Sequence, residues 1–429
     1  MRRIIVGLLV MGMFMVLPLG YVAQEAAGRQ TPKQVKIGAI YPITGPLALT
    51  GIQFLQALKV TADLINNSYD IDSPGNIFRS EGLPNLDGVK VRIIFGDSEG
   101  KPDVGRSEAE RLITVEKVHA LIGCYQSSVT DPVSTVAEMH SIPFLDDSAT
   151  APSLTERGFK WFFRTTPTDI VHVEGMLSLL KELKETRPDL NLKRLAIVCE
   201  DTLFGQDTAK LLKKKAPEYG YEVVVDITYP HEATDVDAEV LRVKRAEPDI
   251  ICMASYLSDA ILLQKTFKKY NVTAPILANS TGHIRYEFQH TLGSDVNGVM
   301  ATQLWSDALI ETKPMAGIFT DLLSERYGEA APMGNLPARG FIGLLTLADA
   351  INRAGSIDPG AIKQALVETD IPGDLLPLPW ERVKFDEKGQ NVYGGVVVIQ
   401  WQDQKQKVVW PKDLAEVKII MPLPPWGER

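Results

Sequence analysis

The chain is poor in the residues that build metal centres and disulfide frameworks. It has 3 cysteines and 6 histidines in 429 residues. Cys124, Cys199 and Cys252 lie far apart, each at or near the end of an apolar run, so we expect buried thiols rather than a disulfide framework; an oxidised pair stays open for an exported protein. His231-Glu232 is not followed by a second histidine at metalloprotease spacing. We expect no metal and no cofactor.

The sequence also lacks the loops that bind nucleotides and the motifs that organise covalent catalysis. It contains no Walker loop, no strand-linked Gly-x-Gly-x-x-Gly and no Gly-x-Ser-x-Gly elbow around Ser127 or Ser128. The formal net charge of −9 argues against nucleic acid or an anionic membrane as partner. A serine hydrolase is the least favoured alternative, because no motif places a base near Ser127. We assign no catalytic residue.

A long apolar run occurs only at the N-terminus. Arg2-Arg3 precede an apolar stretch from Ile4 to Leu19, and small residues follow at positions 20–23. This is the layout of a secretory signal peptide, and the run is shorter than the roughly 18 residues that a membrane span needs. The cleavage region contains no cysteine, so we do not expect a lipid-anchored form. We expect cleavage of residues 1–23, which removes two arginines and shifts the net charge from −9 to −11, and a periplasmic or otherwise extracytoplasmic protein.

Strand-like and helix-like segments alternate along the rest of the chain. The expected strands are short apolar runs at 35–41, 89–95, 120–123, 143–145, 162–164, 195–199, 223–227, 250–254, 276–278 and 299–302. Longer segments with helical spacing separate them, including 52–66, 103–116, 168–184, 206–216 and 259–270. Strands separated by helices of this length indicate βαβ units, and there are too many for one ordinary parallel sheet. We predict an α/β fold with two doubly wound parallel-sheet lobes.

Changes in the character of the chain suggest where the lobes meet. A polar, proline-containing connector at 164–167 precedes a fresh βα series, and a second crossing is expected near 297–299. We therefore predict one lobe from 35–165 plus about 300–380. The other lobe takes 166–299 plus about 381–410, followed by a proline-rich C-terminal tail at 411–429.

Two hydroxyl-rich turns each follow a short apolar strand. They are residues 123–130 (GCYQSSVT) and 147–152 (DSATAP). Hydroxyls and free backbone N–H groups at a helix start form an anion site, and ligands of open α/β sheets bind beyond the carboxyl ends of the strands. Ordinary helix capping and turn chemistry would explain either turn taken alone. Two of them about twenty residues apart suggest a cleft for a small ligand with a carboxylate.

Several blocks, in order along the chain, resemble one known family. The clearest are 35–51 (VKIGAIYPITGPLALTG), 122–130, 148–155 (SATAPSLT) and 163–169 (FRTTPTD). They resemble the type I periplasmic solute-binding proteins, and more narrowly the branched-chain amino acid binding proteins of ABC importers; a weaker likeness continues to about Trp401. The resemblance implies two lobes joined by a three-crossing hinge, a ligand cleft between them and a membrane permease as partner. We expect a monomer.

The resemblance also implies which residues contact the ligand. In the first lobe the two turns would grip the carboxylate, and the matching positions with their neighbours are Gln126, Ser127, Ser128, Ser148, Ala149 and Thr150. Ser148 would act largely through its backbone. The second lobe would contribute Phe204, where the family's amino acid binders tend to carry tyrosine, together with Tyr256 and Ser280. Trp305 is a further candidate.

The second lobe differs from the pattern of the family members that bind amino acids. An acidic residue for the ligand's ammonium is expected near residues 279–281, where no carboxylate occurs. A buried ammonium without an anion is costly, so Asp201 or Asp259 would have to supply the charge. The three aromatic candidates instead suit a flat apolar or aromatic acid. An α-amino acid, an aromatic acid and an amide such as urea all stay open as ligands, and a sensory receptor module for such solutes is the alternative function.

Overall fold

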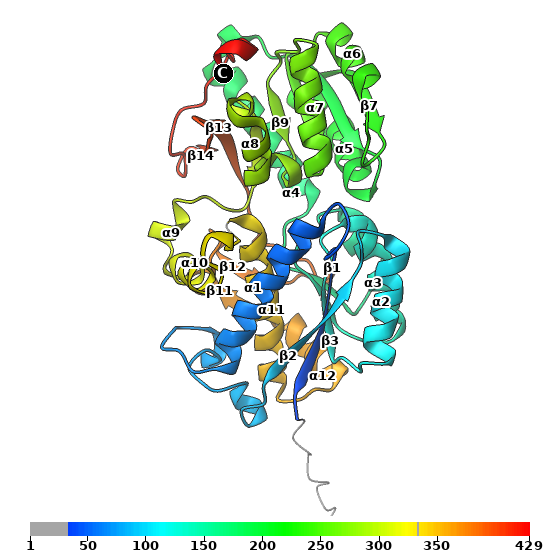
Figure 1. Ribbon diagram of the computed structural model, residues 1–429, viewed down its shortest axis with the longest axis vertical. Coiled ribbons are helices and arrows are strands. Elements are labelled where there is room, and N and C mark those ends of the chain that lie inside the picture. The colour runs from blue at the N-terminus through cyan, green and yellow to red at the C-terminus, as the bar shows by residue number, and fades with distance from the viewer. Residues whose placement is uncertain (1–32, 333) are drawn as a thin grey trace, which may run out of the picture. The chain divides into compact units, whose positions relative to one another are not determined.

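The computed structural model describes residues 33–332 and 334–429, which form two large sheets with helices on both faces of each (Figure 1). The expected signal peptide lies outside the described residues. The first sheet is parallel and has the strand order β2-β1-β3-β4-β5. Its strands are β1 (Val35–Tyr41), β2 (Val91–Asp97), β3 (Ala120–Gly123), β4 (Phe144–Asp146) and β5 (Phe162–Arg164).

Side-chain alternation along the strands builds two apolar layers around this sheet. In β1, Ile37 and Ala39 pack into the layer of α1 and α11, whereas Ile40 packs into the layer of α2 and α3. Successive strand residues point to opposite faces, so a continuous apolar run serves a sheet that is buried on both sides. The helices are α1 (Ala48–Asn66), α2 (Pro102–Thr114), α3 (Ser127–Met139), α10 (Pro314–Tyr327), α11 (Asn335–Ala354) and α12 (Pro359–Val367).

The second sheet has seven strands in the order β14-β13-β10-β9-β8-β6-β7. Its parallel strands are β6 (Arg194–Glu200), β7 (Glu222–Tyr229), β8 (Ile250–Ala254), β9 (Ile276–Ala278) and β10 (Met300–Gln303). Two antiparallel strands, β13 (Val397–Gln402) and β14 (Lys405–Trp410), extend one edge. The helices are α4 (Asp169–Thr186), α5 (Leu203–Lys215), α6 (Asp237–Ala246), α7 (Leu257–Lys269) and α8 (Tyr286–Leu292). The predicted fold of two doubly wound lobes is confirmed, with this antiparallel edge as an addition.

We call the first sheet with its helices the first lobe, and the second sheet with its helices the second lobe. The chain crosses between them after β5, after β10 and between β12 (Arg382–Lys384) and β13. β10 belongs to the second sheet, so the second crossing follows residue 303 rather than 299. β12 pairs with β11 (Asp370–Pro372) in a separate two-stranded sheet, so the expected boundary at 380/381 also lies too early.

The C-terminal segment packs against the second lobe. The Gln400 side chain exchanges hydrogen bonds with the main chain of Ile420, at 2.8 and 3.0 Å. Trp426 is buried, and its indole N–H donates to the Val272 carbonyl at 2.9 Å. Residues 411–429 therefore complete the core of the second lobe.

Cys124, Cys199 and Cys252 are free and buried. Within residues 33–332 and 334–429 no cluster of three histidine, cysteine or acidic side chains is placed to bind a metal ion. The helices of the same residues are too short or too polar to cross a bilayer.

The buried His283 predicts a pH dependence of stability. Burial lowers its pKa to about 3, whereas histidine in an unfolded chain titrates near 6.5. Between these pH values the unfolded state binds the proton and the folded state does not, so this residue's contribution to stability is full above pH 6.5 and is lost as the pH falls toward 3. His283→Phe should therefore flatten the decline of the unfolding free energy by up to about 1.4 kcal/mol per pH unit between pH 6 and 4, measured by urea denaturation.

Phe288, whose ring lies 5.3 Å from that of His283, offers the matched control. Phe288→Leu should lower stability equally at every pH, because it removes packing and no titratable group. Parallel curves for wild type and His283→Phe would contradict the prediction.

Candidate ligand-binding site

The first hydroxyl turn connects β3 to α3. Gly123 ends the strand with φ +134°, and a Cβ there would come within 2.2 Å of the Ile40 carbonyl oxygen, so the turn requires glycine. α3 begins at Ser127, whose side chain is buried. The N–H groups of Ser127 and Ser128 are the first of the helix and have no intrahelical acceptor. They are hydrogen-bond donors at the carboxyl end of the sheet.

The second hydroxyl turn follows β4 and is shaped by Asp146. Its Oδ1 accepts hydrogen bonds from the N–H groups of Ser148, at 3.0 Å, and Ala149, at 2.9 Å. The resemblance assigned the backbone of Ser148 to the ligand, and here that N–H is already engaged. The N–H of Thr150 has no acceptor among the described residues, so this position keeps an open donor.

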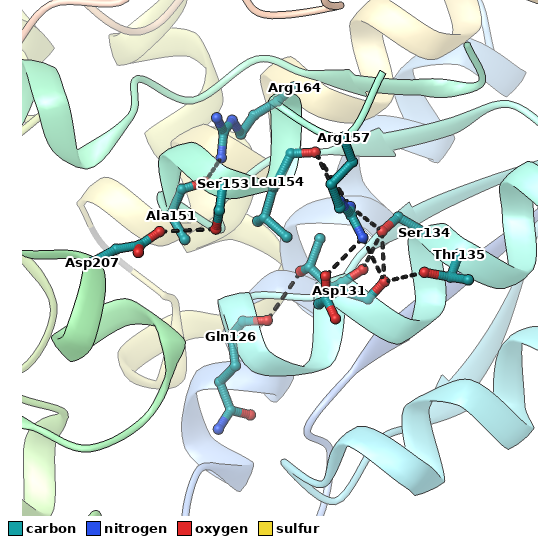
Figure 2. A network of polar contacts seen from close by, with 11 residues as sticks. Gln126, Asp131, Ser134, Thr135, Ala151, Ser153, Leu154, Arg157, Arg164 and Asp207 are labelled. Atoms are coloured by element: carbon teal, nitrogen blue, oxygen red, sulfur yellow. Dashed lines mark hydrogen bonds and ion pairs between the residues drawn. The ribbon is translucent and has the colours of Figure 1, made fainter. Parts of the chain in front are cut away.

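The two turns form one hydrogen-bonded unit. The Ala151 N–H donates to Ser127 Oγ at 3.3 Å. Arg164, at the end of β5, donates to the carbonyl oxygens of Ala149 and Ala151 at 3.1 and 2.8 Å, and Arg157 ties the following segment to α3 (Figure 2). The predicted first-lobe residues are therefore brought together.

Asp169 links the second turn to the second lobe. It is the first residue of α4, it is fully buried, and its N–H donates to the Thr150 carbonyl at 2.8 Å. Asn279 Nδ2 donates to Asp169 Oδ1 and to Thr208 Oγ1, both at 2.8 Å. Burial raises the pKa of Asp169 to about 7. Asp169 was not among the residues predicted from the sequence, although its place at a helix start beside the predicted connector is a usable signal.

Other hydrogen bonds also join the lobes. Ser153 Oγ donates to Asp207 Oδ2 on α5 at 2.9 Å (Figure 2). Arg285, just before α8, donates to Thr50 Oγ1 on α1 at 3.2 Å. Polar side chains of both lobes thus meet around the carboxyl ends of the first sheet.

Aromatic rings from the two lobes meet at Tyr256. Its ring lies 5.9 Å from that of Tyr125 in the first hydroxyl turn and 5.6 Å from that of Phe204 on α5. The ring of His231 lies 4.9 Å away. The predicted pair Phe204 and Tyr256 is therefore brought together with Tyr125, which the sequence analysis did not select although it stands inside the first turn.

The two acidic candidates for an ammonium partner both form hydrogen bonds with His231. Asp201 Oδ1 accepts from the His231 N–H, and Asp259 Oδ2 hydrogen-bonds to His231 Nδ1, each at 2.9 Å. Burial lowers the pKa of His231, but the hydrogen bond and charge of Asp259 outweigh it and raise the pKa overall. Each carboxylate thus already has an imidazole or main-chain partner.

The remaining predicted residues are buried, with different surroundings. Ser280 N–H donates to Thr302 Oγ1 at 3.2 Å, and its hydroxyl faces Arg339. Gln126 Oε1 has no hydrogen-bond partner among the described residues. Trp305 donates to Asp307 and borders a cavity of about 20 Å³ at the start of α11, and no described ring contact joins it to the rings around Tyr256.

Arg339, on α11, lies between predicted residues of both lobes. Nη1 donates to the Ser148 carbonyl at 3.2 Å, and Nη2 donates to Ser280 Oγ at 3.4 Å. Nε donates to Asn335 Oδ1 at 3.1 Å, one helical turn earlier. The sequence signal was a basic residue in the mostly apolar first half of this helix, which is buried from Asn335 to Asn352.

Comparison with known proteins gives this arrangement a family. Residues 34–406 match the model of the periplasmic binding proteins. The chain is similar to the Leu/Ile/Val-binding protein homolog 7 of Brucella abortus (strain 2308), at 27% identity over 94% of this chain and 98% of the relative. Among solved structures it resembles a leucine binding protein of Thermotoga maritima MSB8, with TM-score 0.74 and 22% identity over 89% of this chain and all of the other.

A third similar protein is a solute binding protein of an ABC transporter from Rhodopseudomonas palustris in complex with 4-hydroxybenzoate. Its TM-score is 0.73, at 19% identity over 92% of this chain and 99% of the other. At such identities the structural likeness supports only the two-lobed fold. The family model, in contrast, matches most of the chain, so it identifies the family. The chain therefore belongs to the periplasmic binding protein family.

Proposed function

We propose that this protein is the extracytoplasmic solute-binding component of an ABC importer, and that it captures a small carboxylate-bearing ligand between its lobes. The convergence of the two hydroxyl turns carries the proposal. The hydrogen bond between Ser127 and Ala151 joins the turns, and the open N–H groups of Ser127, Ser128 and Thr150 lie in this unit. Backbone and hydroxyl donors that converge on one carboxylate bind it through charge-assisted hydrogen bonds.

The second lobe supplies the opposite wall. Phe204 and Tyr256 bring aromatic rings to Tyr125, so the apolar part of a ligand held at the turns would lie against rings. The relatives named for leucine, isoleucine and valine favour a branched-chain amino acid as ligand. The absence of a carboxylate from residues 279–281 favours an aromatic or apolar acid instead.

In the proposed cycle the ligand binds the first lobe and then recruits the second. Closure is driven only by contacts that form in the closed state, such as those made by Tyr256. The closed form would then dock on a membrane permease in the periplasm, acting as a monomer.

The contacts of Ser127 do not favour an enzyme. Its Oγ accepts a hydrogen bond from a backbone N–H, and within the described residues neither an imidazole nor a carboxylate hydrogen-bonds to it. A nucleophilic serine needs an adjacent base. The protein therefore binds and delivers its solute unchanged.

Binding should depend on the hydroxyl turns. The mature chain, residues 24–429, would be screened by thermal shift against leucine, isoleucine, valine, 4-hydroxybenzoate, 3-phenylpropanoate, acetamide and urea. A true ligand at about 1,000 times its Kd stabilises the fold by roughly 4 kcal/mol. Ser127→Ala and Thr150→Ala should weaken its binding by roughly 10-fold to 100-fold, because each removes a side-chain hydroxyl that can donate to the carboxylate beside the backbone N–H groups, which alanine keeps.

Thr135 on α3 provides the matched control, since it is an exposed threonine whose hydroxyl bonds only within its helix. Thr135→Ala should bind like the wild type. Stabilisation that stays the same in Ser127→Ala would contradict the carboxylate assignment, and stabilisation by urea or acetamide alone would point to the amide alternative.

The aromatic wall gives a second prediction. Tyr256→Ala should weaken binding by about 10-fold to 100-fold, because a ring contact and its buried area are lost. Tyr256→Phe keeps the ring and removes the hydroxyl, so calorimetry should find its Kd within about threefold of the wild type. Equal losses in both variants would show that the hydroxyl, rather than the ring, contacts the ligand.

A further inference from the structure

Three arginines are buried in the part of the chain that the structure describes, and two of them are well supplied with partners. Arg164 donates four hydrogen bonds, to two main-chain carbonyls and two side-chain oxygens. Arg285 forms an ion pair with Glu287, with Nε 3.1 Å from the carboxylate, and also contacts Thr50. Arg164 thus uses four N–H donors on neutral acceptors, and Arg285 has a carboxylate partner.

Arg339 makes fewer hydrogen bonds than Arg164 and, unlike Arg285, has no ion pair. Its exposed fraction is 4%, and, as for Arg164, no carboxylate of the described residues lies within the 4 Å of an ion pair. A guanidinium has five N–H donors, and three hydrogen bonds account for three of them. One N–H on each terminal nitrogen is therefore open. The bonds to Ser148 and Ser280, at 3.2 and 3.4 Å, are longer than the 2.7–2.9 Å that is typical of charged pairs.

The acidic groups whose charge acts on Arg339 lie beyond ion-pair distance and have hydrogen-bond partners of their own. Asp147 accepts hydrogen bonds from Tyr41 at 2.6 Å and from Ser148 at 3.0 Å. Asp146 is held by main-chain N–H groups, and Asp169 by Asn279. Burial raises the pKa values of these carboxyl groups, to about 6 for Asp147 and about 7 for Asp146 and Asp169.

The position of Arg339 indicates which anionic group would occupy its open N–H donors. Ser148 belongs to the second hydroxyl turn and Ser280 to the second-lobe segment without a carboxylate, so the guanidinium lies between the two halves of the proposed site. An unpaired buried charge is strongly unfavourable, and a planar acid group matches two parallel N–H donors of arginine.

We propose that Arg339 pairs directly with the acid group of the ligand, and that this makes the site selective for carboxylates that carry no α-ammonium. This inference rests on the proposed function, because it places the ligand at the hydroxyl turns. An α-ammonium lies within a few ångströms of its own carboxylate, so the arginine that attracts the acid group repels it. Residues 279–281 offer that ammonium no anion in return.

The test compares acids that differ from an amino acid only by the ammonium. The probes are 4-methylpentanoate with L-leucine, 3-phenylpropanoate with L-phenylalanine, and 4-hydroxybenzoate, titrated calorimetrically into the mature chain. At least one acid should bind, and it should bind more tightly than its amino acid counterpart where it has one. Arg339→Met should weaken the binding of that acid by about 100-fold. Arg339→Lys keeps the charge but loses the planar fork, so it should weaken the binding by about 10-fold.

Ligand-free melting temperatures separate binding from a structural role. Arg339→Met removes three internal hydrogen bonds, two of them 3.2 Å or longer, together with a buried charge that has no ion pair. It should therefore lower the melting temperature by less than Arg164→Met, which removes four internal hydrogen bonds. A melting temperature of Arg339→Met that falls as far as that of Arg164→Met would assign Arg339 to structure and overturn the inference.

Three further outcomes overturn it: no acid binds, the amino acids bind more tightly than their acids, or Arg339→Met keeps the wild-type affinity for the bound acid. Ser127→Ala distinguishes these results from a failure of the proposed function. If Ser127→Ala abolishes the binding of leucine while Arg339→Met does not, the site stands and only the role of Arg339 is wrong. If neither variant changes the binding of any probe, both proposals fail.

Discussion

The shape of the site depends on how Arg164 is buried. The second hydroxyl turn leaves the sheet as irregular chain in the interior, where main-chain carbonyls need donors. Arg164 supplies them to Ala149 and Ala151, and it also donates to Thr155 Oγ1 and Gln390 Oε1. Gln390 lies on the third crossing, between β12 and β13. One side chain thus ties the turn that would hold the ligand to the third crossing between the lobes.

The same region concentrates buried acidic groups. Asp146, Asp147 and Asp169 are all fully or almost fully buried, and each is held by at least one hydrogen bond. Burial raises their pKa values, and Arg164 and Arg339 act in the opposite direction. Such coupled groups are characteristic of functional sites, where polar chemistry is retained in the interior at the expense of stability. Buried polar groups are therefore concentrated where the two lobes meet.

The sequence was informative wherever a local pattern decides the structure. β1, β3, β5, β8 and β9 have the bounds that their apolar runs predicted, because a strand buried on both faces is a continuous apolar run between turns. The ends of the lobes were placed less well. Whether residues 300–303 join the first or second sheet is decided by pairing with β9 and β13, and β13 lies about a hundred residues later in the chain.

The hydroxyl turns were visible in the sequence for a similar reason. Each is a short polar segment next to a strand, and the structure brings Ser127 to Ala151 through one hydrogen bond. Asp169 and Arg339 were not predicted from the sequence, because their contacts are non-local. Each contacts a segment more than a hundred residues away in the chain. A helix start and one basic residue are too common to be singled out without that neighbourhood.

Proteins similar to this chain are associated with chemically different ligands. The similar proteins reported above share the two-lobed fold over nearly their whole lengths at 19 to 27% identity, yet one is named for leucine and another is bound to 4-hydroxybenzoate. Turns that hold a carboxylate in the way proposed above would suit both kinds of ligand, because both carry one. In that proposal, discrimination comes from the charge beside the carboxylate. Near the Ser148 turn and Ser280, this chain has the guanidinium of Arg339, and residues 279–281 have no carboxylate. A zwitterion would bring its ammonium to a positive side chain, whereas an acid without an ammonium would neutralise that side chain.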